Sequence, residues 1–196
     1  SAASDVYKRQ ALFKFQAAEI SPASLVLKSF APDSGMRQDR LQTADKLATQ
    51  GESSSRKVRE NSVQVLKILN SGDANTARKK AEAYAIPYFD FQRMTALAIG
   101  NPWRTATDAQ KQALTKEFQT LLIRTYSGTM LKFKNAKVNI KDNPVVNKGG
   151  KEIVVRAEIN VSGQKPVNMD FTTYQSGSRY RAYNVAVEGA SLVTVY

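Results

Sequence analysis

Cysteine and histidine are both absent from this 196-residue chain, and each absence removes a class of chemistry. A Ser-His-Asp or Cys-His catalytic arrangement cannot be built without them, and zinc and haem sites lose their usual ligands. Catalysis would have to rest on carboxylate, lysine and tyrosine side chains. The sequence therefore disfavours an enzyme, and we predict no catalytic residues, no metal site and no cofactor.

Long hydrophobic runs are lacking as well. No apolar stretch approaches the length that crosses a membrane, and the best apolar run near the N-terminus is Leu25-Val26-Leu27. We therefore expect neither a transmembrane helix nor an export signal in this chain. Hydrophobic residues still make up 42% of the sequence, which is enough to form the core of one domain, with or without a tail.

Acidic residues are outnumbered: 17 Asp and Glu stand against 29 Lys and Arg, which gives a formal net charge of +12. Such an excess favours an anionic partner, which could be a nucleic acid, an acidic membrane surface or an acidic protein. The charge alone does not separate these partners from one another, nor from a protein that is merely basic.

The first 55 residues differ from the rest of the chain because they show little hydrophobic periodicity. Only 39–49 has helical character, and the run Gly51-Glu52-Ser53-Ser54-Ser55 follows it. The first ten residues have no usable pattern and are compatible with a cloning remnant. We predict that 1–55 is an irregular or non-native N-terminal tail and that the folded domain spans 56–196.

Helices are expected from about residue 56 onward. A first apolar stripe ends before Gly72, which is placed to terminate that helix. Asp73 and Asp90 are placed as N-caps of the second and third helices, and this role is favoured for Asp90 over that of a catalytic carboxylate. The residues of the first stripe are Val58, Ser62, Val65, Leu66 and Leu69.

The longest expected helix runs from Thr107 to about Tyr126. Thr107 and Gln110 have the spacing of a capping box. Its apolar face makes it the expected cover for the sheet that follows in the chain. That face consists of Leu114, Phe118, Leu121, Leu122 and Thr125.

Four later segments alternate apolar and polar residues, which is typical of strands with one buried face. The clearest is 152–161, and weaker examples are 136–141, 167–172 and 183–188. Their connections are rich in Gly, Pro, Asn and Ser, which favours consecutive antiparallel hairpins. Because helices precede the strands, we predict an α+β fold with N-terminal helices packed on a four-stranded antiparallel sheet.

With these segments in place, the chain resembles the MlaC family, also called toluene-tolerance proteins, which are periplasmic phospholipid-binding proteins of Gram-negative bacteria. The similarity covers roughly residues 56–196. Three stretches carry it: Tyr88–Thr95 with Gly100 and Trp103-Arg104, then Gln110–Tyr126, and finally Tyr183-Asn184-Val185 with Val187–Val193.

The resemblance implies a fold like that of the nuclear-transport-factor and cystatin-like superfamilies, in which a curved sheet and helices enclose an apolar cavity. It implies a monomeric shuttle that carries diacyl phospholipid between an outer-membrane lipoprotein–porin complex and an inner-membrane ABC transporter complex, which maintains outer-membrane lipid asymmetry. Family members begin with an export signal and continue into a C-terminal helical region, and we expect this chain to lack both.

The same resemblance implies that apolar side chains between the sheet and the long helix surround acyl tails. Taken singly, each apolar sheet side chain is better explained as ordinary core, and Trp103 as an anchor for its loop. The tyrosines Tyr126 and Tyr183 could wall the cavity with their hydroxyls at its mouth. The predicted lipid-binding residues are Trp103, Phe118, Leu121, Leu122, Tyr126, Ile153, Val155, Ala157, Ile159, Val167, Met169, Phe171, Tyr183 and Val185.

Lysines cluster at the start of the sheet. We predict that Lys132, Lys134, Lys137 and Lys141 form a docking surface for partners or lipid headgroups, with a simple solvated hairpin as the alternative. A basic nucleic-acid-binding module is a second functional reading, although the lysines lack interleaved aromatics that would stack on bases. A small-ligand enzyme on the same fold is the third.

Overall fold

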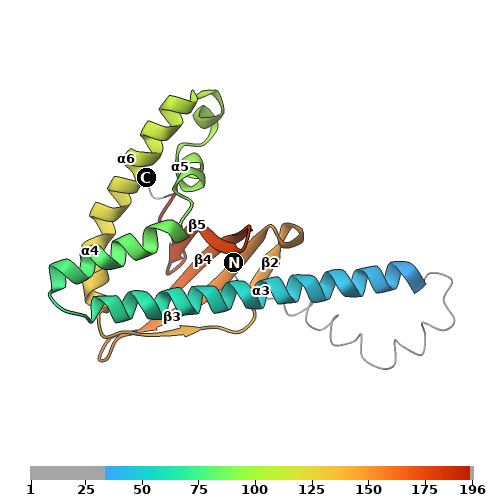
Figure 1. The fold of residues 1–196 in the computed structure, drawn as a ribbon, viewed down its shortest axis with the longest axis horizontal. Coiled ribbons are helices and arrows are strands. Elements are labelled where there is room, and N and C mark those ends of the chain that lie inside the picture. Colours follow the sequence, from blue (N-terminus) through green and yellow to red (C-terminus); the bar gives the residue numbers. More distant parts are fainter. Residues whose placement is uncertain (1–33, 195–196) are drawn as a thin grey trace.

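The computed structural model describes residues 34–194, and its arrangement is shown in Figure 1. The helices are α3 (Ser34–Leu69), α4 (Ala74–Ala85), α5 (Phe91–Ile99) and α6 (Asp108–Met130), with short 3₁₀ turns η2 (Ile86–Tyr88), η3 (Asn101–Thr105), η4 (Leu131–Phe133) and η5 (Lys148–Gly150). The strands are β1 (Lys137–Ile140), β2 (Val145–Asn147), β3 (Glu152–Asn160), β4 (Val167–Ser176), β5 (Arg179–Val187) and β6 (Ala190–Ser191). The predicted α+β class is confirmed. Within the described part of the chain, no helix is long and apolar enough to cross a membrane.

The expected helix caps are present. The Asp73 carboxylate accepts a hydrogen bond from the backbone N–H of Thr76, and Asp90 accepts one from that of Arg93. Thr107 and Gln110 form the complete capping box at the start of α6. These contacts satisfy helix N–H groups that have no partner within the helix itself. α6 continues past the expected end at Tyr126 to Met130.

The sheet is antiparallel, in the order β1-β3-β4-β5-β6, with β2 also paired to β3. The consecutive hairpins β3–β4 and β4–β5 confirm the predicted meander, while β2 and β6 were not predicted. They are only three and two residues long, so neither is long enough to display an alternating pattern. Both strands pair antiparallel with their neighbours, β2 with β3 and β6 with β5.

A β-bulge interrupts the pairing of β4 with β5. Thr172 pairs with Asn184 but Thr173 pairs with Ala182, which leaves Tyr183 as the extra residue. A bulge changes the direction in which the side chains of its strand point. The regular alternation that we predicted through Tyr183 therefore does not hold at this position.

The prediction that 1–55 forms an irregular tail is wrong for residues 34–55, because these residues belong to the single helix α3. Residues 1–33 lie outside the described part of the chain. Within 34–55 the buried positions are Gly51 and Ser54, small residues that carry no hydrophobic signal. Ser54 is fully buried, and its hydroxyl lies 2.7 Å from Thr173 Oγ1. A Cβ atom on Gly51 would come within 3.0 Å of the Pro144 ring.

The predicted covering of the sheet by the long helix is also wrong. α3 contacts β1, β2, β3 and β4, whereas α6 packs chiefly on α5 and α4. Figure 1 shows α3 running across the sheet while α6 rises away from it. The helix that lies across the strands is therefore α3, whose N-terminal half looked irregular in the sequence. The two buried positions in that half, Gly51 and Ser54, carry small residues.

Two clusters of buried side chains make up the core. One joins Met94 of α5, Phe118 and Leu122 of α6, and Tyr183 and Val193 of the β5–β6 region. The other lies on β3 and β1 and contains Ile140, Ile153, Val155 and Ala157, with Val58 of α3 packed against it. The helices α5 and α6 therefore contact one end of the sheet and α3 contacts the other.

Candidate functional site

A large apolar cavity lies between the helices and the sheet. Its volume is about 490 Å³, and its walls come from all four helices and from strands β1, β3, β4 and β5. Apolar side chains predominate, among them Met169 and Phe171 from the sheet and Leu66 and Met94 from the helices. This volume falls within the range of small-molecule sites. The site can hold an elongated apolar ligand and offers few groups for acid–base chemistry.

Several predicted lipid-binding residues lie together on the cavity wall. Those on α6 occupy one side, and those on the strands occupy the sheet side. The lining members of the predicted set are Leu122, Tyr126, Ala157, Ile159, Val167, Met169, Phe171 and Val185.

The other predicted residues lie away from the cavity wall. Ile153 and Val155 are fully buried in the β1–β3 core cluster, and Phe118 and Tyr183 pack in the other cluster. Period-two alternation identifies the buried face of a strand but does not separate its solid part from the part that borders a cavity. The bulge places Tyr183 outside the row of residues that line the site.

Trp103 and Leu121 are the two remaining members of the set. The Trp103 indole, in η3, has the Lys111 ammonium 5.5 Å from its ring centroid. Leu121 is 41% exposed on the outer side of α6. Neither residue lines the cavity.

The lining residues outside the long helix and the strands were not among the predicted lipid-binding residues. Val58, Val65, Leu66 and Leu69 of α3 line the cavity, and the sequence predicted this stripe only as a helix face. The segment from Ile86 through Met94 contributes further apolar walls. It overlaps the Tyr88–Thr95 stretch that carried the family resemblance, so that stretch was the signal available for finding these residues.

A few polar groups interrupt the cavity wall. Tyr84 of α4 donates to Asn61 Oδ1 of α3 at 3.2 Å, and burial raises the pKa of this tyrosine. Thr173 donates to the carbonyl of Ile153 at 2.9 Å. Ser127 of α6 accepts a hydrogen bond from Arg78. These groups are hydrogen-bonded within the protein, as buried polar groups must be to avoid a large desolvation cost.

A polar network ties α5 to the sheet near the cavity. Tyr174 donates to the Asp90 carboxylate at 2.5 Å, and Arg181 lies 3.8 Å from the same carboxylate. Arg181 also donates to the carbonyl of Phe89 at 2.9 Å. Burial and the hydrogen bond to Asp90 raise the pKa of Tyr174, so its hydroxyl stays protonated and keeps donating. The N-cap residue of α5 is thereby fixed to β4 and β5.

The second half of this network centres on Tyr183. Its hydroxyl donates to Glu152 Oε1 at 2.7 Å, and the Arg93 guanidinium lies 3.8 Å from the centroid of its ring. Burial and the Glu152 carboxylate raise the pKa of Tyr183. Burial acts to raise the pKa of Glu152, but hydrogen bonds from Tyr183 and Asn147 outweigh it, so that pKa is lowered. The pair therefore consists of a neutral phenol and an ionised carboxylate at neutral pH.

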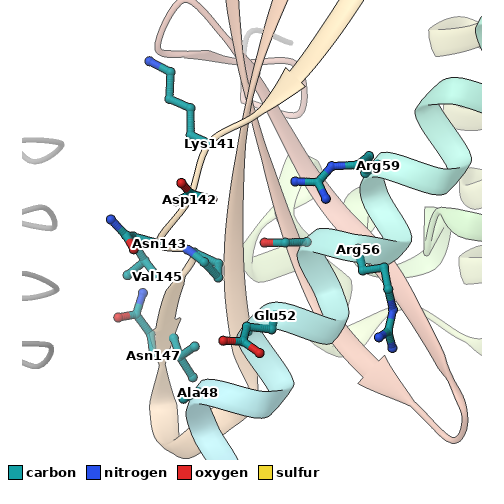
Figure 2. A pocket seen from close by; sticks show the side chains of 13 residues that line it. Ala48, Glu52, Arg56, Arg59, Lys141, Asp142, Asn143, Val145 and Asn147 are labelled. Atoms are coloured by element: carbon teal, nitrogen blue, oxygen red, sulfur yellow. The ribbon is translucent and has the colours of Figure 1, made fainter. Parts of the chain in front are cut away.

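A second concavity, of about 700 Å³, lies on the outer flank of α3. The loop between β1 and β2 forms its other wall. Figure 2 shows the Arg59 side chain extending from α3 toward the strands, with Glu52 on the same helix. Lys141 stands at the end of β1 beside the groove. Both signs of charge are present, so the lining of this groove is more polar than that of the cavity.

The four predicted docking lysines follow one another along η4 and β1. Lys132 and Lys137 are exposed. Lys141 lies 3.9 Å from Glu158, a separation at which a largely exposed pair contributes little. The backbone carbonyl of Lys134 accepts a hydrogen bond from the Asn70 side chain, which anchors this segment to the end of α3. In the described residues, the ion pairs within 4 Å do not involve Lys132, Lys134 or Lys137.

Comparison with known proteins places this architecture in a family. A family model described as MlaC protein matches residues 59–196. A solved structure of the phospholipid-binding protein from Ralstonia solanacearum, in complex with a phospholipid, superposes with a TM-score of 0.60 and 28% sequence identity. That match covers 71% of this chain and 80% of the other chain. On the strength of the family model, which spans the C-terminal part of α3, the other helices and the sheet, the chain belongs to the MlaC family.

Proposed function

We propose that this protein is a phospholipid carrier rather than an enzyme, and that the cavity holds acyl tails of a diacyl phospholipid. The observation that carries the proposal is the apolar cavity of about 490 Å³ between helices and sheet. The phospholipid in the solved structure of the Ralstonia solanacearum protein supports it. Phospholipid would then be cargo, and no cofactor is needed.

The energetics explain why such a carrier is useful. Removing one methylene from water is worth about 0.8 kcal/mol, so two tails with some thirty methylenes represent on the order of 20 kcal/mol. A lipid does not leave a bilayer for water at a useful rate against that cost. A cavity about as apolar as the bilayer makes exchange between membrane and protein nearly balanced. A small difference in lipid affinity between the carrier and the membrane complex on either side then sets the direction of lipid transfer.

We further propose that the carrier works in the periplasm as a soluble monomer. It would exchange lipid between an outer-membrane lipoprotein–porin complex and an inner-membrane ABC transporter complex, and so maintain outer-membrane lipid asymmetry. The lysines along η4 and β1, together with the groove that begins at Lys141, provide a basic surface for docking to acidic partners or headgroups. No function in nucleic-acid binding is proposed, because the apolar cavity has no use in it.

The test is to purify the protein from a bacterial host, denature it and analyse the organic extract by lipid mass spectrometry. We expect close to one diacyl phospholipid per protein molecule. A control protein of similar charge, purified in parallel, measures lipid carried on the surface. An extract with no more lipid than the control would refute the carrier function.

A further inference from the structure

The side chain of Arg78 occupies an unusual position in the seam between α4 and α6, two helices that approach each other in Figure 1. Its Nη1 donates to Ser127 Oγ at 3.1 Å, and its Nη2 donates to Asn75 Oδ1 at 3.2 Å. Its Nε is buried and has no hydrogen-bond partner among the described residues. The guanidinium is therefore held by neutral oxygens alone and keeps unused donor capacity.

This guanidinium lies directly behind the wall of the cavity. Ser127, which accepts its hydrogen bond, is only 5% exposed and lines the cavity. A hydroxyl that accepts from an arginine still has one proton to donate, and that proton can rotate toward the cavity side. Ser127 thus presents a neutral donor on the cavity wall, and the Arg78 cation lies directly behind it.

Among the described residues, Arg78 has no counter-charge at ion-pair distance. Its neighbours Lys79 and Lys80 add positive charge on the exposed side of α4. Glu82 stands one turn further along and lines the cavity without reaching ion-pair distance from the guanidinium. A partly buried cation without an anion is costly, and a bound anion relieves that cost.

From these contacts we propose that Arg78 and Ser127 form the subsite for the phosphodiester of the lipid whose tails fill the cavity. This inference rests on the proposed carrier function and adds the place where the headgroup is held. Guanidinium groups suit phosphate oxygens because their donors form a planar fork and their charge is permanent. The seam between α4 and α6 is then the mouth of the cavity, and the carrier distinguishes phospholipids from uncharged diacyl lipids.

The test compares two lipids with identical tails, phosphatidylglycerol and diacylglycerol, bound to delipidated protein from the same detergent micelles. The wild type should bind phosphatidylglycerol more tightly. Arg78→Gln should weaken phosphatidylglycerol binding by about tenfold or more and leave diacylglycerol binding unchanged, because a hydrogen bond to a charged group is lost. Arg78→Lys should recover part of the preference. The control is Lys79→Gln, which removes the same charge from an exposed position on the same helix. This variant should retain the full preference for phosphatidylglycerol.

Four results would overturn the assignment. In the first, Arg78→Gln keeps the wild-type preference for phosphatidylglycerol. In the second, it weakens both lipids equally and lowers the melting temperature, which would show that Arg78 only joins α4 to α6. In the third, inorganic phosphate binds the delipidated wild type through Arg78 without competing with phosphatidylglycerol, which would indicate a separate anion site. In the fourth, the wild type binds neither lipid, which would remove the carrier function itself, whereas the first three leave that function intact.

Discussion

A matched pair of substitutions on β3 tests whether the cavity holds acyl tails. Ile159 and Val155 lie on the same face of the strand, four residues apart. Ile159 lines the cavity, whereas Val155 is fully buried in the β1–β3 core cluster. Replacing each by tryptophan adds the same ring chemistry to an open space in one case and to a packed core in the other.

The two variants should lose different properties. At Ile159 the indole can enter the cavity, so the delipidated protein should unfold within about 1 kcal/mol of wild type, as volume-tolerant swaps do. A ring that displaces roughly four tail methylenes removes about 3 kcal/mol of burial. Lipid affinity should therefore fall on the order of a hundredfold. At Val155 the ring has no space, so overpacking should cost about 1–3 kcal/mol or more.

The assay combines thermal or urea unfolding of delipidated proteins with the lipid content of each protein as purified. A ligand that binds only the folded state raises apparent stability, so delipidated samples are needed to isolate the packing effect. The reasoning is refuted if Ile159→Trp is strongly destabilised when delipidated yet carries its full lipid load. That result would show that the space beside Ile159 is closed core and that the tails lie elsewhere.

Two further predictions concern the hydrogen bond between Tyr183 and Glu152 and the lysines along η4 and β1. Tyr183→Phe should cost about 1–2 kcal/mol at neutral pH, because Glu152 loses its hydrogen bond. The lowered pKa of Glu152 gives stability that is present above its ordinary value of 4.5 and is lost as the pH falls through the folded-state pKa. The difference between wild type and variant, measured by urea unfolding, should therefore shrink toward pH 3, and a constant difference would contradict the pairing. Replacing Lys132, Lys134 and Lys137 by Gln should slow association with vesicles rich in phosphatidylglycerol and leave bound lipid unchanged. The wild-type rate should fall as salt rises, because screening reaches about 10 Å at 0.1 M, and a rate indifferent to both changes would mark these lysines as solvated surface only.

Much of the fold follows from local signals in the sequence. Asp73, Asp90 and the pair Thr107 and Gln110 marked helix starts, and the structure shows each as a cap. These features were predictable because a cap depends on a side chain and on backbone groups two or three residues away. The alternation in 152–161 identified β3 and its buried face for the same local reason.

The division of that buried face into core and cavity could not be predicted in the same way. Val155 and Ile159 show the same period and similar chemistry, yet only Ile159 lines the cavity. The difference depends on whether other side chains fill the space beside each residue, and that is a property of the tertiary arrangement. Tyr183 shows a second reason why prediction from the sequence fails. A single extra residue in β5 changes the direction of the Tyr183 side chain, and a bulge of this kind cannot be recognised from the alternation of apolar and polar residues.

The contact of α3 with the sheet could not be predicted from the sequence, and the reason also explains how this helix packs. Sequence periodicity detects large apolar side chains, but the contact of α3 with the sheet uses Gly51 and Ser54. A Cβ atom at Gly51 would meet the Pro144 ring at 3.0 Å, so only glycine allows this approach without a shift of the loop. Ser54 replaces apolar packing with a buried hydrogen bond to Thr173, whose hydroxyl also donates to the carbonyl of Ile153. Small residues let this helix lie close to the strands near the outer groove, and larger ones such as Leu66 follow where the helix borders the cavity. Gly51 and Ser54 therefore mark a closed part of this interface, and larger residues such as Leu66 border the part that we propose holds lipid.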